Sequence, residues 1–134
     1  MSVTDALPPV VERMLALWNG GAVDPADVYE SVPEDVLPTI AKYRAAFPDL
    51  RWTVDQWFGA EGRYILRMHA TGSHTGARFE SELGTSEPTG ESFTMNGIEV
   101  LELRDDRIAD AWQVWDMGPL YAALGARVGP NPAQ

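Results

Sequence analysis

The feature of this sequence that most constrains its fold is a change of hydrophobic period near residue 50. Before that point, apolar residues recur every three or four positions, as Val11, Met14 and Trp18 do, which is the spacing of a helix that buries one face. After it, apolar and polar residues alternate between glycine-rich turns, which indicates strands. Helices followed by antiparallel strands predict an α+β fold in which the helices cover one face of a curved sheet. If the helices close that sheet into a cone, its interior is the natural place for a small-molecule pocket.

Caps, prolines and glycines set the boundaries of the elements. Pro8 with Pro9, and Asp24 with Pro25, are start signals for a helix and for a short helical turn, and a further helix after Ser31 ends before Pro48. With 134 residues, 45% of them hydrophobic, we expect a single domain over 1–134. The predicted strands are 50–58, 63–71, 77–83, 93–103 and 107–115, followed by a short helix at 120–124 and a flexible tail at 126–134.

Composition excludes several classes of function. The 20 acidic and 10 basic residues give a formal net charge of −10, which would repel phosphate backbones and anionic membranes, so we expect neither nucleic acid nor membrane as a partner. The chain has no cysteine and its two histidines lie five residues apart with no apparent third ligand, so no metal site is predicted. No apolar run approaches the roughly 20 residues that span a bilayer, and no signal-peptide pattern is present, so a cytoplasmic protein is the default.

The last predicted strand ends on a carboxylate. Alternation places Asp116 on the same face as Trp112 and Val114. A carboxylate in an apolar, partly desolvated pocket has its charged form disfavoured, so its pKa rises towards neutrality and it can act as a general acid or base. The alternative is structural, because an Asp before a short helix commonly accepts hydrogen bonds from backbone N–H groups at the helix start.

The second predicted strand carries two further candidates. Arg67 and His69 share one face of RYILRMHAT, and His69 could share proton transfer with Asp116 if that face lines the pocket. A lone histidine or arginine on a half-exposed strand is otherwise simply solvated.

The five tryptophans should mostly form core, although some could line a pocket for a flat ligand. The residues that we predict to contact a substrate are Trp112, Trp57, His74, Met95 and Tyr43.

An ordered set of short motifs resembles the SnoaL-like polyketide cyclases. The motifs are AFPDLR at 46–51, TGSHTG at 71–76, PTG at 88–90, GIEVLEL at 97–103 and DRIADAWQVWDMGPLYAALG at 106–125. The resemblance implies the cone-shaped α+β barrel that this family shares with scytalone dehydratase and limonene epoxide hydrolase. It also implies an intramolecular aldol closure without cofactor or metal, with Asp116 as acid and base, a hydrophobic small-molecule substrate, and a homodimer or homotetramer packed through its sheets.

Two departures from the family's pattern bear on this expectation. Some of these cyclases carry a histidine on the penultimate strand, where this chain has Glu102, which would add a second carboxylate to the site if it faced inward. The 75–88 connection is longer than usual and could be a lid or a longer hairpin.

Fold alone does not choose a function, so two alternatives to a cyclase stay open: an epoxide hydrolase using Arg67 and His69, and a non-catalytic small-molecule-binding module.

Overall fold

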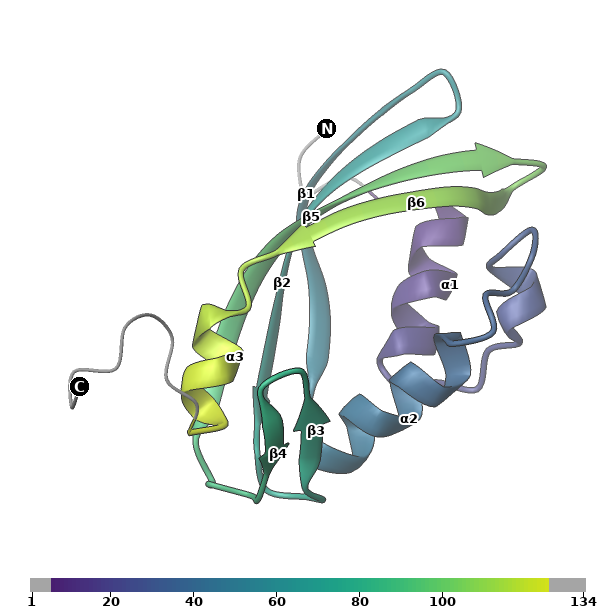
Figure 1. Cartoon of the computed structure of the whole chain (residues 1–134). Coiled ribbons are helices and arrows are strands. Elements are labelled where there is room, and N and C mark those ends of the chain that lie inside the picture. The colour runs from purple at the N-terminus through teal and green to yellow at the C-terminus, as the bar shows by residue number, and fades with distance from the viewer. Residues whose placement is uncertain (1–5, 126–134) are drawn as a thin grey trace.

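The computed structural model describes residues 6–125, which form three helices, one short 3₁₀ helix and six strands (Figure 1). The chain begins with the helical half that the 3.6-residue period predicts and continues as sheet. The elements are α1 (Pro9–Trp18), η1 (Pro25–Asp27), α2 (Val36–Ala46), β1 (Arg51–Ala60), β2 (Arg63–Ser73), β3 (Phe79–Ser81), β4 (Gly84–Ser86), β5 (Ser92–Arg104), β6 (Arg107–Trp115) and α3 (Gly118–Ala123).

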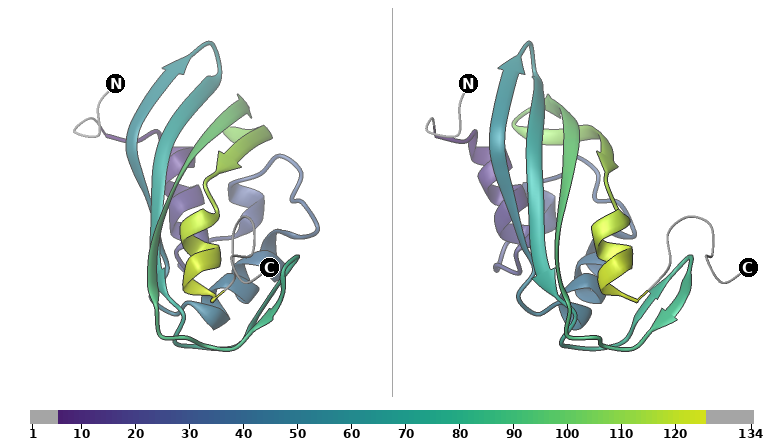
Figure 2. Two further views of the ribbon diagram at one scale, coloured as in Figure 1. Left: turned by 60° about the vertical axis from the view of Figure 1, so that its left-hand side comes forward. Right: turned by 90° about the vertical axis from the view of Figure 1, so that its left-hand side faces the viewer.

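The main sheet has four antiparallel strands in the order β1-β2-β5-β6. It is strongly curved, and α1 and α2 lie on its concave side while α3 lies against β5 (Figures 1 and 2). The sheet is not closed into a barrel by strand pairing, because β1 and β6 are its two edges. The helices therefore complete the cone, and the predicted α+β class is confirmed.

Each edge of the sheet is covered by a segment of the helical half. At β1, Asn19 accepts the Trp52 N–H at 2.7 Å and donates its side-chain amide to the Trp52 carbonyl at 3.1 Å. At β6, Tyr29 forms a parallel bridge with Ile108, supported by backbone hydrogen bonds at 2.8 and 2.9 Å. Because an uncovered edge leaves backbone groups unpaired, these contacts stabilise the sheet and fix the helical half over it.

Two apolar clusters fill the concave side. One joins α1 to the inward faces of the sheet around Leu66 and Leu101, both fully buried. The other lies at the end of the sheet where α3 and the β3–β4 hairpin meet, around Phe47 and Met95. The long strands alternate as a period of two requires, so that buried residues of β2 such as Met68 face the helices and their neighbours face outward.

Most predicted elements are confirmed within a few residues. The 107–115 strand matches β6, and the helix predicted after Ser31 begins only at Val36. The 77–83 stretch is not one strand, because a turn after Ser81 returns the chain as β4, so the long 75–88 connection contains a two-stranded hairpin. The predicted tail at 126–134 lies outside the described residues. In the described part of the chain, no helix is long and apolar enough to cross a membrane.

Candidate functional site

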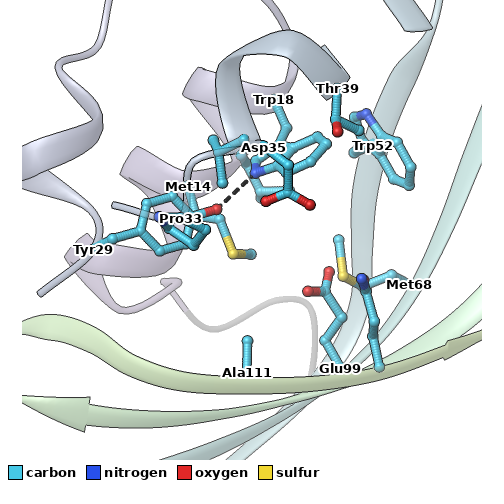
Figure 3. Close-up of a pocket in the computed structure, with 13 residues that line it drawn as sticks. Met14, Trp18, Tyr29, Pro33, Asp35, Thr39, Trp52, Met68, Glu99 and Ala111 are labelled. Atoms are coloured by element: carbon cyan, nitrogen blue, oxygen red, sulfur yellow. Dashed lines mark hydrogen bonds between the residues drawn. The ribbon is translucent and has the colours of Figure 1, made fainter. Parts of the chain in front are cut away.

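A pocket of about 250 Å³ lies between the helical half and the concave face of the sheet (Figure 3). It exists because α1 and the segment before α2 are held above β5 and β6 by the edge contacts described above. Every strand of the main sheet contributes at least one residue to it. Its lining consists of Met14, Leu15, Trp18, Tyr29, Pro33, Asp35, Val36, Thr39, Trp52, Met68, Glu99, Ala111 and Gln113.

Glu99 is the ionisable group that the sheet places inside this pocket. It lies on the inward face of β5, in the alternating series that also contains Met95, Gly97 and Leu101. Its side chain is half-buried, and burial raises the pKa of the Glu99 carboxyl from its ordinary value of 4.5 to about 7. The physical cause is desolvation, because the apolar surroundings disfavour the charged carboxylate. Near neutral pH, Glu99 can therefore both accept and donate a proton.

The absence of a side chain at Gly97 leaves room for an indole ring behind the pocket lining. A Cβ atom at this position would lie 2.3 Å from the Trp115 ring, so the indole packs directly over the β5 backbone. Trp115 in turn contacts Trp52 edge to face at a centroid distance of 5.0 Å. Trp52, which lines the pocket, is thus supported by an indole ring whose position requires a glycine two residues before Glu99.

Two oxygen-bearing groups face Glu99 across the pocket. The Tyr29 hydroxyl accepts a hydrogen bond from the Trp18 indole N–H at 2.9 Å. Asp35 immediately precedes α2, yet its carboxylate makes no capping hydrogen bond there and is exposed at the pocket's rim. Figure 3 shows the Tyr29 hydroxyl and the carboxylates of Asp35 and Glu99 directed towards the same space.

Trp52 adds an aromatic ring to the pocket lining. Its indole ring packs against Trp18 at a centroid distance of 5.9 Å. Its Nε1 atom is buried and has no hydrogen-bond partner among the described residues. A buried donor without a partner costs about 1–3 kcal/mol, and because protein atoms cover Nε1, a ligand in the pocket does not reach it.

Four of the predicted site residues lie on the outer face of the sheet. Arg67 and Asp116 are exposed, and His69 and Glu102 are half-exposed. Arg67, His69 and Glu102 belong to the outward series of β2 and β5, and Asp116 directly follows the last residue of β6. The same series on β6 carries Trp112, whose relative exposure is 59%. The predicted sharing of a face by Asp116, Trp112 and Val114 is therefore present, but that face is opposite to the one that Ala111 and Gln113 present to the pocket.

Asp116 accepts one backbone hydrogen bond at the start of α3, although the N-cap residue of that helix is Met117. Its Oδ1 accepts the N–H of Gly118, the first residue of α3, at 3.1 Å. His69 is held by a different carboxylate, since its Nδ1 lies 2.8 Å from both oxygens of Asp55. Asp55 reaches the outer face because β1 bulges between Val54 and Gln56. These contacts do not join Asp116 to His69, and the catalytic roles predicted for them stay predictions.

The other predicted substrate contacts belong to the two cores. Trp57 packs edge to face on Tyr64 in the first cluster, whereas Met95 and Tyr43 belong to the second. His74 is fully buried beside Phe47, with its Nε2 2.8 Å from the Ala77 carbonyl oxygen. Among the described residues that line the pocket, none of the nine predicted site residues is present.

The residues that line the pocket differ in how far the sequence alone could have predicted them. Glu99 could have been found, because alternation within GIEVLEL places it with Leu101 on an apolar face. Tyr29 and Asp35 stand in irregular segments without a period, so their direction depends on tertiary contacts. Within residues 6–125, no group of three or more His, Cys, Asp or Glu side chains is arranged to hold a metal ion.

Comparisons with known proteins support one family. The model of the SnoaL-like polyketide cyclase family matches residues 30–124. The fold is similar to that of AclR, a candidate hydroxylase from Streptomyces galilaeus, with 25% identity, a TM-score of 0.69 and coverage of 92% of this chain and 83% of that one. It is also similar to that of IdmH, a candidate polyketide cyclase from Streptomyces antibioticus, with 24% identity, a TM-score of 0.65 and coverage of 87% and 96%. None of the curated proteins matches the chain significantly.

Proposed function

Because the chain belongs to the SnoaL-like polyketide cyclase family, we propose that it is an acid/base enzyme acting on a polyketide-like carbonyl compound, with Glu99 as its proton-transfer group. The observation that carries this proposal is the position of Glu99, a desolvated carboxyl group in the pocket. A general acid or base works best when its pKa lies near the working pH. Perturbed carboxyl groups in clefts are enriched at functional sites.

The proposed reaction is an intramolecular ring closure of the aldol type. The Glu99 carboxylate takes a proton from the carbon beside a carbonyl, and the C–H electrons become the electrons of an enolate. The enolate carbon attacks a second carbonyl of the same molecule, forming the ring C–C bond and leaving an alkoxide. The proton held by Glu99 is returned to that alkoxide, so that acid and base are one residue and the reaction needs no external oxidant or reductant.

The pocket's composition separates this proposal from its alternatives. An epoxide hydrolase of this fold would need an arginine beside its carboxylates, and the described residues that line the pocket include no arginine. Arg67 and His69, on which that alternative rested, lie on the outer face. A binding module would use the same pocket without proton transfer, so a measurement of proton transfer separates it from an enzyme.

A simple ketone can test for proton transfer without knowledge of the natural substrate. We choose 2-tetralone, a flat bicyclic ketone, and follow exchange of its α-protons in D₂O by NMR with the purified protein. The proposal predicts acceleration above buffer by the wild type and loss of that acceleration in Glu99→Gln, by about 10²–10⁴-fold. Asp116→Asn is the matched comparison: the proposal predicts nearly unchanged exchange, while dependence on Asp116 and not on Glu99 would favour the sequence-based assignment. Exchange that neither substitution alters would contradict the acid/base role of Glu99.

We further propose that the outer face of the sheet is covered by a second copy of the chain. An apolar patch crosses this face, with Phe58, Ile65, Ile98, Trp112 and Val114 all more than 40% exposed. Monomers rarely expose contiguous apolar patches of large size.

The charges beside the patch select one arrangement of the two copies. Cationic Arg63 and Arg67 lie on β2, whereas anionic Glu102 and Asp110 lie opposite Arg63 in the row that continues across β5 and β6. A two-fold axis parallel to the strands and between β2 and β5 brings β2 of one copy over β5 of the other, so Arg63 meets Glu102. An axis perpendicular to the strands that crosses β2 at Ile65, in the apolar patch, would place Arg63 of one copy over Arg67 of the other and bring like charges together. Charge complementarity therefore favours a face-to-face homodimer with the axis parallel to the strands.

A further inference from the structure

Tyr29 has an unused hydrogen-bond donor beside Glu99. A phenolic hydroxyl has one proton to donate and lone pairs to accept. The lone-pair side of Tyr29 is occupied by the Trp18 indole N–H at 2.9 Å. No acceptor for the Tyr29 proton is present among the described residues, and Figure 3 shows the hydroxyl directed into the pocket.

The surroundings of Tyr29 keep that proton in place. Burial raises the pKa of the Tyr29 hydroxyl above its ordinary value of 10.0, the hydrogen bond from Trp18 opposes this increase, and the negative charges of Glu99 and Asp35 add to it. At neutral pH the hydroxyl is therefore a proton-bearing donor and not a phenolate. These contributions place Glu99 and Asp35 within electrostatic range of the Tyr29 hydroxyl.

The fold holds this hydroxyl in a defined position. The backbone of Tyr29 is bridged to Ile108 at the edge of β6, and its ring is buried in the first core cluster. Trp18, which donates to it, ends α1 next to Asn19, whose side chain is bound to β1. A donor fixed in this way loses little conformational freedom when it binds a ligand, which is a requirement for stabilising charge that develops during a reaction.

We propose that Tyr29 is a second catalytic residue, whose hydroxyl donates a hydrogen bond to the carbonyl oxygen of an enolisable ketone while Glu99 takes the proton from the adjacent carbon. This inference rests on the proposed function and names the substrate class of the same pocket. As the C–H bond breaks, its electron pair moves into the C–C bond that becomes the enolate double bond, and the carbonyl π electrons move onto the oxygen. The hydrogen bond from Tyr29 strengthens as that oxygen gains charge.

The experiment uses the same 2-tetralone exchange together with binding of 2-naphthol, a stable aromatic analogue of the tetralone enol. Naphthalene, which lacks the oxygen, is the reference ligand. Tyr29→Phe is expected to slow exchange about 10²–10³-fold, as loss of a single donor to a developing oxyanion does. It is also expected to remove a preference for 2-naphthol over naphthalene of about three- to tenfold in the wild type. Tyr121→Phe is the matched control, since it removes a hydroxyl bonded to Glu82 at 2.8 Å outside the pocket, and should change neither quantity.

Tyr29→Phe also leaves the Trp18 indole without its partner and could disturb folding. We therefore compare Trp18→Phe with the double variant Trp18→Phe/Tyr29→Phe. Neither protein has the Trp18 indole N–H, so no donor loses its partner, and the two proteins differ only in the Tyr29 hydroxyl. Loss of exchange and of the 2-naphthol preference in the double variant supports the inference. Retention of both, or a wild type that binds the two ligands equally, overturns it. If Glu99→Gln alone slows exchange, the Tyr29 inference fails and the proposed function stands; if Glu99→Gln leaves exchange intact, the proposed function fails.

Discussion

Replacing Glu99 with glutamine tests the pocket's electrostatics in the absence of any ligand. The carboxyl group has a pKa of about 7 in the fold, compared with an ordinary value of 4.5. Below pH 4.5 the group is protonated in both the folded and the unfolded chain. Between pH 4.5 and 7 the unfolded chain releases the proton while the folded chain retains it, so stability is lost as pH rises through this window. Above pH 7 the full loss is present.

The magnitude follows from the two pKa values. One pKa unit corresponds to about 1.4 kcal/mol, so the shift of Glu99 lowers the free energy of unfolding by about 3 kcal/mol between pH 4.5 and pH 8. Glutamine has a similar shape and no charge. The stability of Glu99→Gln relative to the wild type should therefore rise by about that amount over the same range, whatever its offset at low pH.

Urea denaturation followed by tryptophan fluorescence measures this difference at a series of pH values. The difference in free energy of unfolding between the two proteins is taken at each pH. Groups that titrate alike in both proteins cancel in this difference. Glu102→Gln is the matched control, because it removes a carboxylate from the outer face of the same strand, where the side-chain exposure is 47%. A stability difference for Glu99→Gln that stays constant from pH 4.5 to 8 would refute the assignment of Glu99 as a desolvated carboxyl.

The remaining predictions concern the face and the scaffold of the sheet. Trp112→Lys places a charge in the centre of the proposed interface and should convert a dimer into a monomer by analytical ultracentrifugation, whereas a wild type that is monomeric at micromolar concentration contradicts the interface. Asn19→Ala removes two hydrogen bonds to the β1 backbone and should lower the free energy of unfolding by about 1–3 kcal/mol, while Asn96→Ala on the outer face should have little effect. Gly97→Ala would place Cβ against the Trp115 ring and should cost about 1–3 kcal/mol by overpacking; unchanged stability would refute the tight contact.

The sequence predicts the architecture well because period and punctuation are local properties. The helix after Pro8, the strand at 107–115 and the stop at Gly125, which has a φ of +82°, all depend on neighbours in the chain. The 77–83 segment is interpreted wrongly as one strand, since only the register of Phe79 against Ser86 shows that the chain reverses there. Whether strands or helices complete the cone is likewise a tertiary property.

The site is less predictable because alternation reveals which residues share a face but not which face is inward. Arg67 with His69, and Asp116 with Trp112, are grouped correctly by period, and the sheet turns both groups away from the pocket. On β5 the sequence does indicate which face is inward, because Met95 and Leu101 are apolar. Glu99 lies on that same face, since it is separated from each of them by an even number of positions. Tyr29 lies in an irregular segment, and its place depends on the bridge to Ile108, which connects segments far apart in the sequence.

The most direct test of the account is an NMR titration of the Glu99 side-chain carboxyl carbon in the folded wild type. Uniformly ¹³C-labelled protein gives the signal, and its disappearance in Glu99→Gln assigns it. We expect a midpoint at about pH 7, caused by desolvation inside the pocket. A midpoint near the ordinary value of 4.5 would show a solvated carboxylate and would contradict the role of Glu99 as the acid and base of this site.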